Sequence, residues 1–417
     1  MYITHVIQRY FPAISGSELY FQRLSENLIN RHKIKVTCSN ALDFNVFGNS
    51  NGKLVDENFS IINKVPIYRF PIKYQYIINK FPLIGYKRIK NLLKKISKLR
   101  IPPVDLYNIL INGPNCPDLL NFLLKSDHDL IHSTCFPFST NLYALITGKI
   151  KKVPTLVTPF FHFANSRYQD KALLRILKMF DKILTCSSLE SKYIIQNSLN
   201  KNIKEKIIQI KMGVDFKKFR KAEPSKLKSK FGIESCPMIL FCGYKNYEKG
   251  AIHLLQSIKY VLKDISNVIY FFIGPSTKGF NIEKKKLSKT IRKHIINIGV
   301  VPYDNLKIKI NSFAAADIYA MPSRSDAYGI SFLEAMACKK PVIGANIGAT
   351  PEIIKNNYTG ILVPFGAPKI LAKNIIKLLK NQNQRQELGE NGYNQIKNQT
   401  WENISKMIEE IYLSKND

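Results

Sequence analysis

Short apolar runs alternate with helical patterns along the first half of the chain. The first run lies within Met1–Tyr10 and leads into a loop with Pro12 and Gly16, a helical pattern over about residues 17–30 and a second run, Ile34–Cys38. Three later runs are each followed by helical or loop-like sequence: Asp129–His132, Thr155–Thr158 and Lys182–Cys186. Because strands joined by helices lie parallel in one sheet, this pattern predicts an α/β domain.

The same alternation starts again in the second half. Strand-like and helical stretches follow one another in this order: Met238–Gly243, Ala251–Asp264, Val268–Gly274, Ile296–Val301, Leu306–Ala315 and Ile318–Ser323. This second series predicts a second doubly wound domain. The lysine-rich stretch Lys217–Lys230 has no sustained apolar period and is typical of a surface connector. We therefore expect domains at residues 1–207 and 208–399.

Length and composition agree with two compact domains. A chain of 417 residues exceeds the roughly 250 to 300 residues at which one hydrophobic core stops growing. No apolar run reaches the roughly 18 residues of a membrane-spanning helix, and Arg9 interrupts the segment where a signal peptide would continue. Seven cysteines spread singly between Cys38 and Cys338 argue against disulfides and zinc, and favour a reducing cytoplasm.

The formal net charge of +33 has three open explanations. They are nucleic acid binding, an anionic membrane surface with phosphate-bearing substrates, and a codon bias. The densest basic stretch, Lys87–Arg100, carries apolar residues at helical spacing and is either a membrane-surface helix or a solvated face packed on its own domain. No basic–aromatic reader motif accompanies the charge, so we expect no nucleic acid partner.

Two stretches of the second domain carry residues suited to a phosphorylated ligand. Gly243 and Lys249-Gly250 flank a turn between a strand and a helix, where backbone N–H groups and a lysine can hold phosphate; the alternative is an ordinary turn. Asp326 lies in the loop after the strand Ile318–Ser323, and Glu334 lies on the next helix. Parallel sheets bind ligands at this end of their strands, although two acids at this spacing can also be solvated separately.

The segment Met321–Glu352 resembles the donor site of family 4 retaining glycosyltransferases. That pattern is P-S-x-x-E-x-x-G-x-x-x-x-E-A-M-A-x-G-x-P-V, followed by G-G-x-P-E. Similar matches to the family are Gly16–Glu18, Cys186–Ser188, Met212–Asp215 with Phe219, Gly243–Gly250 (family G-R-L-x-x-x-K-G), Gly360–Val363 and Thr400–Glu402. The resemblance implies the GT-B fold, in which two Rossmann-like domains face each other across a cleft. It further implies an acceptor-binding first domain, against which the helix of about residues 400–417 packs, and a donor-binding second domain.

The resemblance also implies roles for individual residues. Glu334 would bind the ribose hydroxyls of the donor nucleotide, Asp326 would bind the sugar, and Lys249 would neutralise the diphosphate. His162 lies near a family histidine that contacts the transferred sugar, although Phe160 aligns equally well. Such a site needs neither a metal ion nor another cofactor, because the cation of Lys249 replaces the divalent ion of other transferases.

Backbone groups would complete the donor site. Amides near Tyr328, Gly329 and Ile330 would hold the donor, together with the turn at Gly243. Gly16 would let the N-terminal loop approach the phosphate from the opposite domain. These assignments follow from the resemblance alone.

The chain also departs from the family pattern. Tyr244 replaces the arginine of the phosphate turn, so either Lys245 reaches the diphosphate or the positive charge there is lower. Asp326 replaces a glutamate, which shortens the reach by one methylene. Three further replacements are Met212 for asparagine, Lys339 for glycine and Ala349 for glycine.

Three functions remain open at this point. The first is a retaining transferase that moves a sugar from a nucleotide diphosphate to a hydroxyl acceptor, such as a surface polysaccharide or a lipid-linked sugar. The second is a nucleotide-sugar binding or scaffold subunit with weakened catalysis, which Tyr244 and Lys339 suggest. The third is a nucleic-acid binder. We expect a cytoplasmic protein, with peripheral contact to the inner face of the membrane through Lys87–Arg100 as an option.

Overall fold

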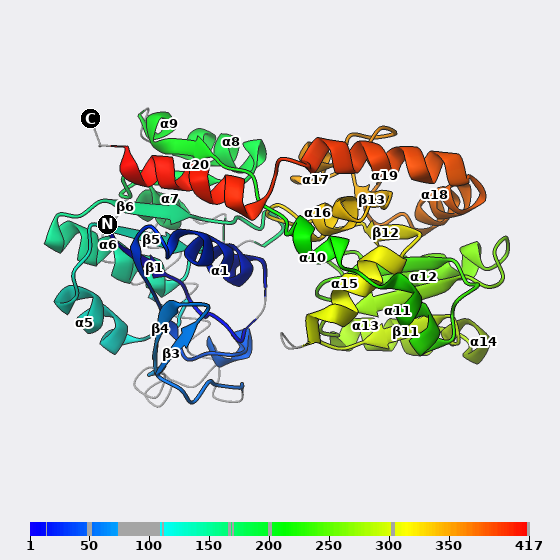
Figure 1. The fold of residues 1–417 in the computed structure, drawn as a ribbon, viewed down its shortest axis with the longest axis horizontal. Helices are drawn as coiled ribbons and strands as arrows, with labels where there is room; N and C mark the ends of the chain where they lie inside the picture. Colours follow the sequence, from blue (N-terminus) through cyan, green and yellow to red (C-terminus); the bar gives the residue numbers. More distant parts are fainter. Residues whose placement is uncertain are drawn as a thin grey trace. The chain divides into compact units, whose positions relative to one another are not determined.

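The structure, a computed structural model, divides the chain into two compact units. It describes residues 1–13, 15–47, 52–73, 109–110, 112–165, 168, 171–198, 202–301 and 305–414. The N-terminal unit comprises Met1–Lys211 and Ile404–Asp417, and the C-terminal unit comprises Met212–Asn403 (Figure 1). The predicted amphipathic helix Lys87–Arg100 lies outside the described residues. The expected domain limits, 1–207 and 208–399, stay predictions.

The N-terminal unit contains an eight-stranded sheet. Its order is β3-β4-β2-β1-β5-β6-β7-β8, and every pairing is parallel except that of β3 with β4. The strands are β1 (Tyr2–Val6), β2 (Lys33–Ser39), β3 (Phe59–Ile62), β4 (Val65–Phe70), β5 (Leu130–Thr134), β6 (Thr155–Thr158), β7 (Lys182–Thr185) and β8 (Ile207–Gln209). The parallel sheet expected from the sequence is thus confirmed, and the antiparallel hairpin is an addition to it.

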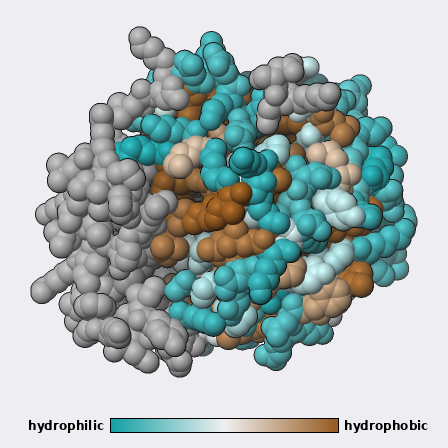
Figure 2. Space-filling model, turned by 90° about the vertical axis from the view of Figure 1, so that its left-hand side faces the viewer, coloured by the Kyte–Doolittle hydropathy of each residue, from teal (hydrophilic) through white to brown (hydrophobic). Residues whose placement is uncertain are grey.

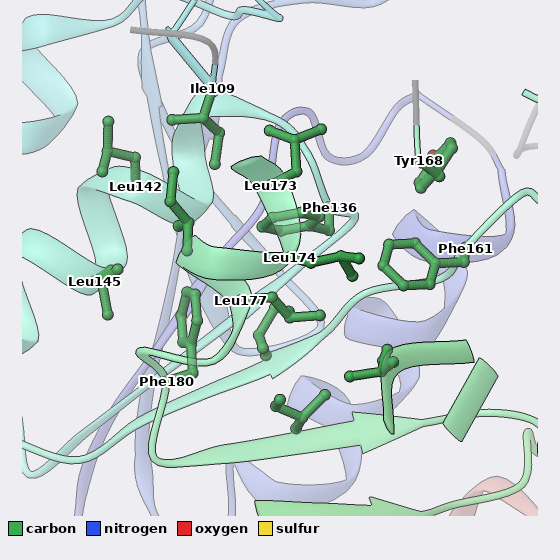
Figure 3. Close-up of a cluster of buried hydrophobic side chains, with 14 of the residues drawn as sticks. Ile109, Phe136, Leu142, Leu145, Phe161, Tyr168, Leu173, Leu174, Leu177 and Phe180 are labelled. Atoms are coloured by element: carbon green, nitrogen blue, oxygen red, sulfur yellow. The ribbon is translucent and has the colours of Figure 1, made fainter. Parts of the chain in front are cut away.

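Helices of the N-terminal unit cover this sheet and close its core. They are α1 (Gly16–Leu28), η1 (Phe44–Phe47), α5 (Pro117–Lys125), α6 (Ser139–Lys151), α7 (Lys171–Leu177), α8 (Ser188–Asn197) and α9 (Ile203–Lys206). One large cluster of buried apolar side chains joins α6, α7 and the strands β6 and β7; Figure 3 shows Phe136, Phe161 and Phe180 among them. A second cluster, around Leu119 and Ile131, joins α5 to the sheet.

The last helix, α20 (Trp401–Leu413), ends in the N-terminal unit, although its first residues belong to the C-terminal one. Tyr412 inserts its hydroxyl between two buried histidines, at 3.2 Å from Nε2 of His5 and 2.5 Å from Nδ1 of His132. Glu409 accepts two hydrogen bonds from Arg31 at 2.8 and 2.7 Å, and His32 Nε2 lies 2.6 Å from the same carboxylate. These contacts fix the end of the chain, red in Figure 1, to β1 and β5.

The C-terminal unit contains a six-stranded, wholly parallel sheet of order β11-β10-β9-β12-β13-β14. Its strands are β9 (Met238–Cys242), β10 (Ile269–Ile273), β11 (Ile295–Ile298), β12 (Ile318–Met321), β13 (Val342–Ala345) and β14 (Gly360–Val363). Its helices are α10 (Phe216–Arg220), α11 (Pro224–Phe231), α12 (Ala251–Val261), α13 (Lys278–Lys286), α14 (Lys289–Arg292), α15 (Leu306–Ala315), α16 (Ile330–Ala337), α17 (Thr350–Ile353), α18 (Pro368–Lys380) and α19 (Gln382–Ile396). The second doubly wound domain is therefore confirmed.

One prediction from the sequence is wrong. The stretch Lys217–Lys230 is not an irregular connector, because it lies mostly in α10 and α11 and belongs to the C-terminal unit. Helix α11 begins with Pro224 in its first turn, where the missing N–H and the fixed φ of proline suit a helix. Leu227 is buried and α11 packs against α15.

The described surface is polar over most of the side shown in Figure 2, with apolar side chains gathered in a band near its centre. Among the residues that the structure describes, no helix combines the length and apolar character needed to cross a bilayer.

Candidate active site

The turn after β9 packs closely on the loop after β12. Gly250 precedes α12 with φ +76°, in the left-handed region that favours glycine. A Cβ at this position would overlap the carbonyl oxygen of Pro322. The backbone contact therefore requires glycine, and it brings Lys249 beside the loop that carries Asp326.

Lys249 and Asp326 form a direct ion pair. The Lys249 ammonium lies 2.7 Å from Oδ1 of Asp326 and donates to the carbonyl oxygen of Ser325 at 3.1 Å. The second carboxylate oxygen, Oδ2, is buried and has no hydrogen-bond partner among the described residues. An unpaired buried carboxylate oxygen is costly, and a hydroxyl group of a ligand can satisfy it. The structure thus brings together two of the residues that the sequence singled out.

Glu334 lies on α16 and pairs with a lysine that the sequence analysis missed. Lys309, on α15, lies 2.5 Å from Oε1 of Glu334, whose side chain is 9% exposed. The pKa of the Tyr319 phenol, on β12, is raised well above its usual value, first by burial, with smaller contributions from the charges of Asp326 and Glu334. Both carboxylates follow β12 along the chain, Asp326 in the loop after it and Glu334 on α16.

Lys245 is buried, and its ammonium group has two hydrogen-bond acceptors within the C-terminal unit. It donates to the Asn297 side chain at 2.6 Å and to the carbonyl oxygen of Ile298 at 2.7 Å, at the end of β11. Burial is the main cause that lowers its pKa, to about 8. Tyr244, which replaces the family arginine, has half of its side chain exposed. The expected contact of Lys245 with the diphosphate stays a prediction, and Lys249 is the cation paired with Asp326.

The start of α16 presents backbone amides beside these side chains. Gly329 precedes the helix with φ +81°, and Ile330 is its first residue. Tyr328 is buried and donates from its hydroxyl to Gln399 at 3.2 Å. Amides at a helix N-terminus attract anions, so this backbone can complete a phosphate site.

The N-terminal unit carries the remaining expected residues. Gly16 is the first residue of α1. The ring of Phe160 is buried and packs on Tyr20 at 5.3 Å between centroids, whereas His162 is only half-buried. Of the two aligned residues, His162 is thus the one with a polar side chain that reaches the surface. Its role stays a prediction.

Two departures from the family pattern have a structural explanation. Lys339 follows Cys338, the C-cap of α16, with φ +55°, which explains why glycine is usual there, and its ammonium pairs with Glu390 at 2.8 Å. Met212 is buried and serves packing. Neither contact involves Lys249, Asp326 or Glu334.

The chain is similar to known glycosyltransferases. Residues 225–395 match the model of the family described as Glycosyl transferases group 1. This segment is thus similar to a group 1 glycosyltransferase domain. An uncharacterized glycosyltransferase of Methanocaldococcus jannaschii is 26% identical to the chain over 409 residues, which are 98% of this chain and 97% of that one. The domain contains Lys249, Asp326 and Glu334.

Two further comparisons concern a relative and a solved structure. A GDP-mannose-dependent phosphatidylinositol monomannoside mannosyltransferase of Corynebacterium glutamicum is 26% identical over 215 residues, 49% of this chain and 55% of its own. The structure of HepE from Anabaena, in complex with UDP and glucose, superposes with a TM-score of 0.71 at 16% identity and covers 99% of both chains. The fold is GT-B, as the sequence predicted.

Proposed function

We propose that the chain is a retaining glycosyltransferase of family 4, which moves a sugar from a nucleotide diphosphate to a hydroxyl acceptor. The observation that carries the proposal is the Lys249–Asp326 pair, with its unsatisfied Oδ2 atom, beside the starts of α12 and α16. A cation, an acceptor for a sugar hydroxyl and two sets of backbone amides are the groups that a sugar diphosphate requires.

The proposed chemistry rests on fixed charges. Breaking the bond between the anomeric carbon and the phosphate oxygen leaves negative charge on the diphosphate, and the Lys249 ammonium with the amides of Tyr328–Ile330 would stabilise that charge. The acceptor would attack on the face that the phosphate leaves, and the departing phosphate oxygen would take its proton. In this scheme no side chain serves as the base and no metal ion is required.

Glu334 would bind the ribose hydroxyls of the donor. Its carboxylate accepts from Lys309 through Oε1, so Lys309 orients it. The relatives differ in nucleotide: one is named as GDP-mannose-dependent and the solved structure holds UDP. The acceptor class that we favour is a lipid-linked sugar or surface polysaccharide, with the chain acting on the cytoplasmic side.

The test is turnover of a panel of UDP-, GDP- and ADP-sugars, with lipid-linked and free sugar acceptors. Proton NMR of the product determines whether the anomeric configuration is retained. Product with inverted configuration would contradict the proposed mechanism, and the variant Lys249→Met should abolish turnover.

The second candidate is a nucleotide-sugar binding subunit with weakened catalysis. The exposed Tyr244, in place of an arginine, is the observation that favours it. Donor binding without hydrolysis or transfer over the whole panel would support this candidate against the first.

A further inference from the structure

Glu190 is a buried acid to which the proposed reaction assigns no role. It lies in the first turn of α8, and its side chain is 1% exposed. Oε1 accepts a hydrogen bond from the backbone N–H of Phe161 at 2.8 Å, and Oε2 accepts one from the N–H of Cys186 at 2.8 Å. The carboxylate therefore joins the loop after β6 to the loop after β7.

The helix itself does not need this carboxylate. Ser187 already caps α8, since its hydroxyl accepts from the backbone N–H of Glu190 at 3.2 Å. Burying a carboxylate is unfavourable, and burial raises the pKa of Glu190 to about 7 although the backbone N–H groups lower it. The carboxylate instead makes one hydrogen bond to each of the two loops. Only a carboxylate offers two acceptor oxygens, one for each loop, since glutamine offers one oxygen and an N–H₂ group.

The loop after β6 is held at Phe161, which lies between a strained residue and His162. Phe160 has φ +55°, a conformation that is strained for a bulky residue and needs support from its surroundings. The Phe161 side chain packs in the core cluster, at 5.4 Å from Tyr168 and 6.3 Å from Phe136 between ring centroids (Figure 3). Its backbone N–H is fixed by Glu190, and the next residue is His162.

We propose that Glu190 is the positioning residue for His162. By fixing the N–H of Phe161 and that of Cys186, it holds the backbone from which the imidazole projects, so that the ring keeps one orientation. The inference deepens the proposed function and rests on the role that the family resemblance implies for His162, contact with the transferred sugar.

The test compares Glu190→Gln with a control on the same turn. Glutamine keeps the size of the side chain, but its oxygen can accept from only one of the two backbone N–H groups. Its N–H₂ group would face the other N–H group, donor against donor. Ser191→Ala removes a contact with the Thr185 hydroxyl at 2.7 Å and leaves the carboxylate untouched. We expect Glu190→Gln to lower kcat about tenfold with an unchanged KM for the donor, and Ser191→Ala to change kcat less than twofold.

A double-mutant cycle separates positioning from general stability. In a His162→Ala background, Glu190→Gln should change kcat less than twofold, because the group it positions is gone. A tenfold loss in that background would overturn the inference, and so would an unchanged kcat in the single variant.

A spectroscopic measurement decides the inference even if the protein turns over no donor. With ¹³C-labelled histidine, the signal lost in His162→Ala identifies the His162 ring. Glu190→Gln should shift or broaden this signal, and Ser191→Ala should leave it unchanged. Absence of turnover with the shift present would contradict the proposed function alone; an identical signal in Glu190→Gln would overturn the positioning role.

Discussion

Acid should loosen the attachment of α20 through two histidines that the fold keeps neutral. Burial lowers the pKa of His5 from 6.5 to about 3 and that of His132 well below 6.5. The unfolded chain therefore binds more protons below pH 6.5, and stability falls as the pH falls through that value. Between pH 7.5 and pH 5, keeping one such ring neutral lowers the free energy of unfolding by about 2 kcal/mol, and this figure is the same for any folded pKa below about 4.

Glu190 has the opposite effect on stability over the same pH range. Its pKa, raised from 4.5 to about 7, means that the folded state takes up its proton first, so acidification from pH 7.5 to 5 stabilises the unit by about 2 kcal/mol. The change in stability of the wild type with pH is therefore the sum of a loss from the histidines and a gain from Glu190. Comparison with a variant that lacks one histidine removes every shared contribution.

The informative variant is His5→Gln, which keeps a polar side chain near Ser25 and Tyr412 but does not titrate. It should be less stable than the wild type at pH 7.5, because the ring stacked on Phe21 at 4.6 Å is lost. Between pH 7.5 and 5 its stability should fall by about 2 kcal/mol less than that of the wild type. Urea-dependent hydrogen exchange of peptides that cover β1 and α20 measures this difference. An equal fall in both proteins would refute the reasoning.

Three predictions concern the candidate active site. Lys249→Met should lower kcat about 10²- to 10³-fold, since it removes the cation beside the leaving group. Comparison of its initial rate with that of Lys245→Met shows which of the two lysines contributes more to catalysis. Gly250→Ala should destabilise the C-terminal unit by about 1 to 3 kcal/mol, measured by urea unfolding followed through Trp401 fluorescence. The control Gly232→Ala, at φ +62° with no atom near its Cβ position, should lower the stability less. Equal losses of stability would contradict the close contact of Gly250 with Pro322. Lys309→Met should weaken binding of a nucleoside diphosphate by calorimetry, because it leaves Glu334 unpaired; an unchanged Kd would contradict the role given to the pair.

Most of the fold could be predicted because its strands are short, apolar and followed by helices. The hairpin of β3 and β4 could not, since its turn is formed by Asn63 and Lys64, with φ +50° and +71°, and lacks the glycine that marks such turns. The helix α11 was missed for a related reason. Its lysine-rich sequence shows no sustained apolar period, although Pro224 stands at the helix start, where proline is favoured.

The sequence likewise indicates some residues of the candidate site and not others. Lys249, Asp326 and Glu334 could be named as candidates because they follow predicted strands and match a family motif, and their roles stay predictions. Lys309 and Glu190 could not, because each acts on a segment 25 or 29 residues away and no local pattern marks it. The position of the Lys245 ammonium is another such case, since its partners lie on β11.

We propose that the C-terminal unit binds a nucleoside diphosphate through Glu334 and the turn at Lys249. The most direct measurement is the thermal shift of the full chain with UDP, GDP and ADP, with Glu334→Ala compared with Glu390→Ala, a surface acid paired with Lys339. A ligand at 100 times its Kd should stabilise the wild type by about 2.7 kcal/mol. We predict a shift for one nucleotide that persists in Glu390→Ala and disappears in Glu334→Ala; a shift unchanged in Glu334→Ala would contradict the account.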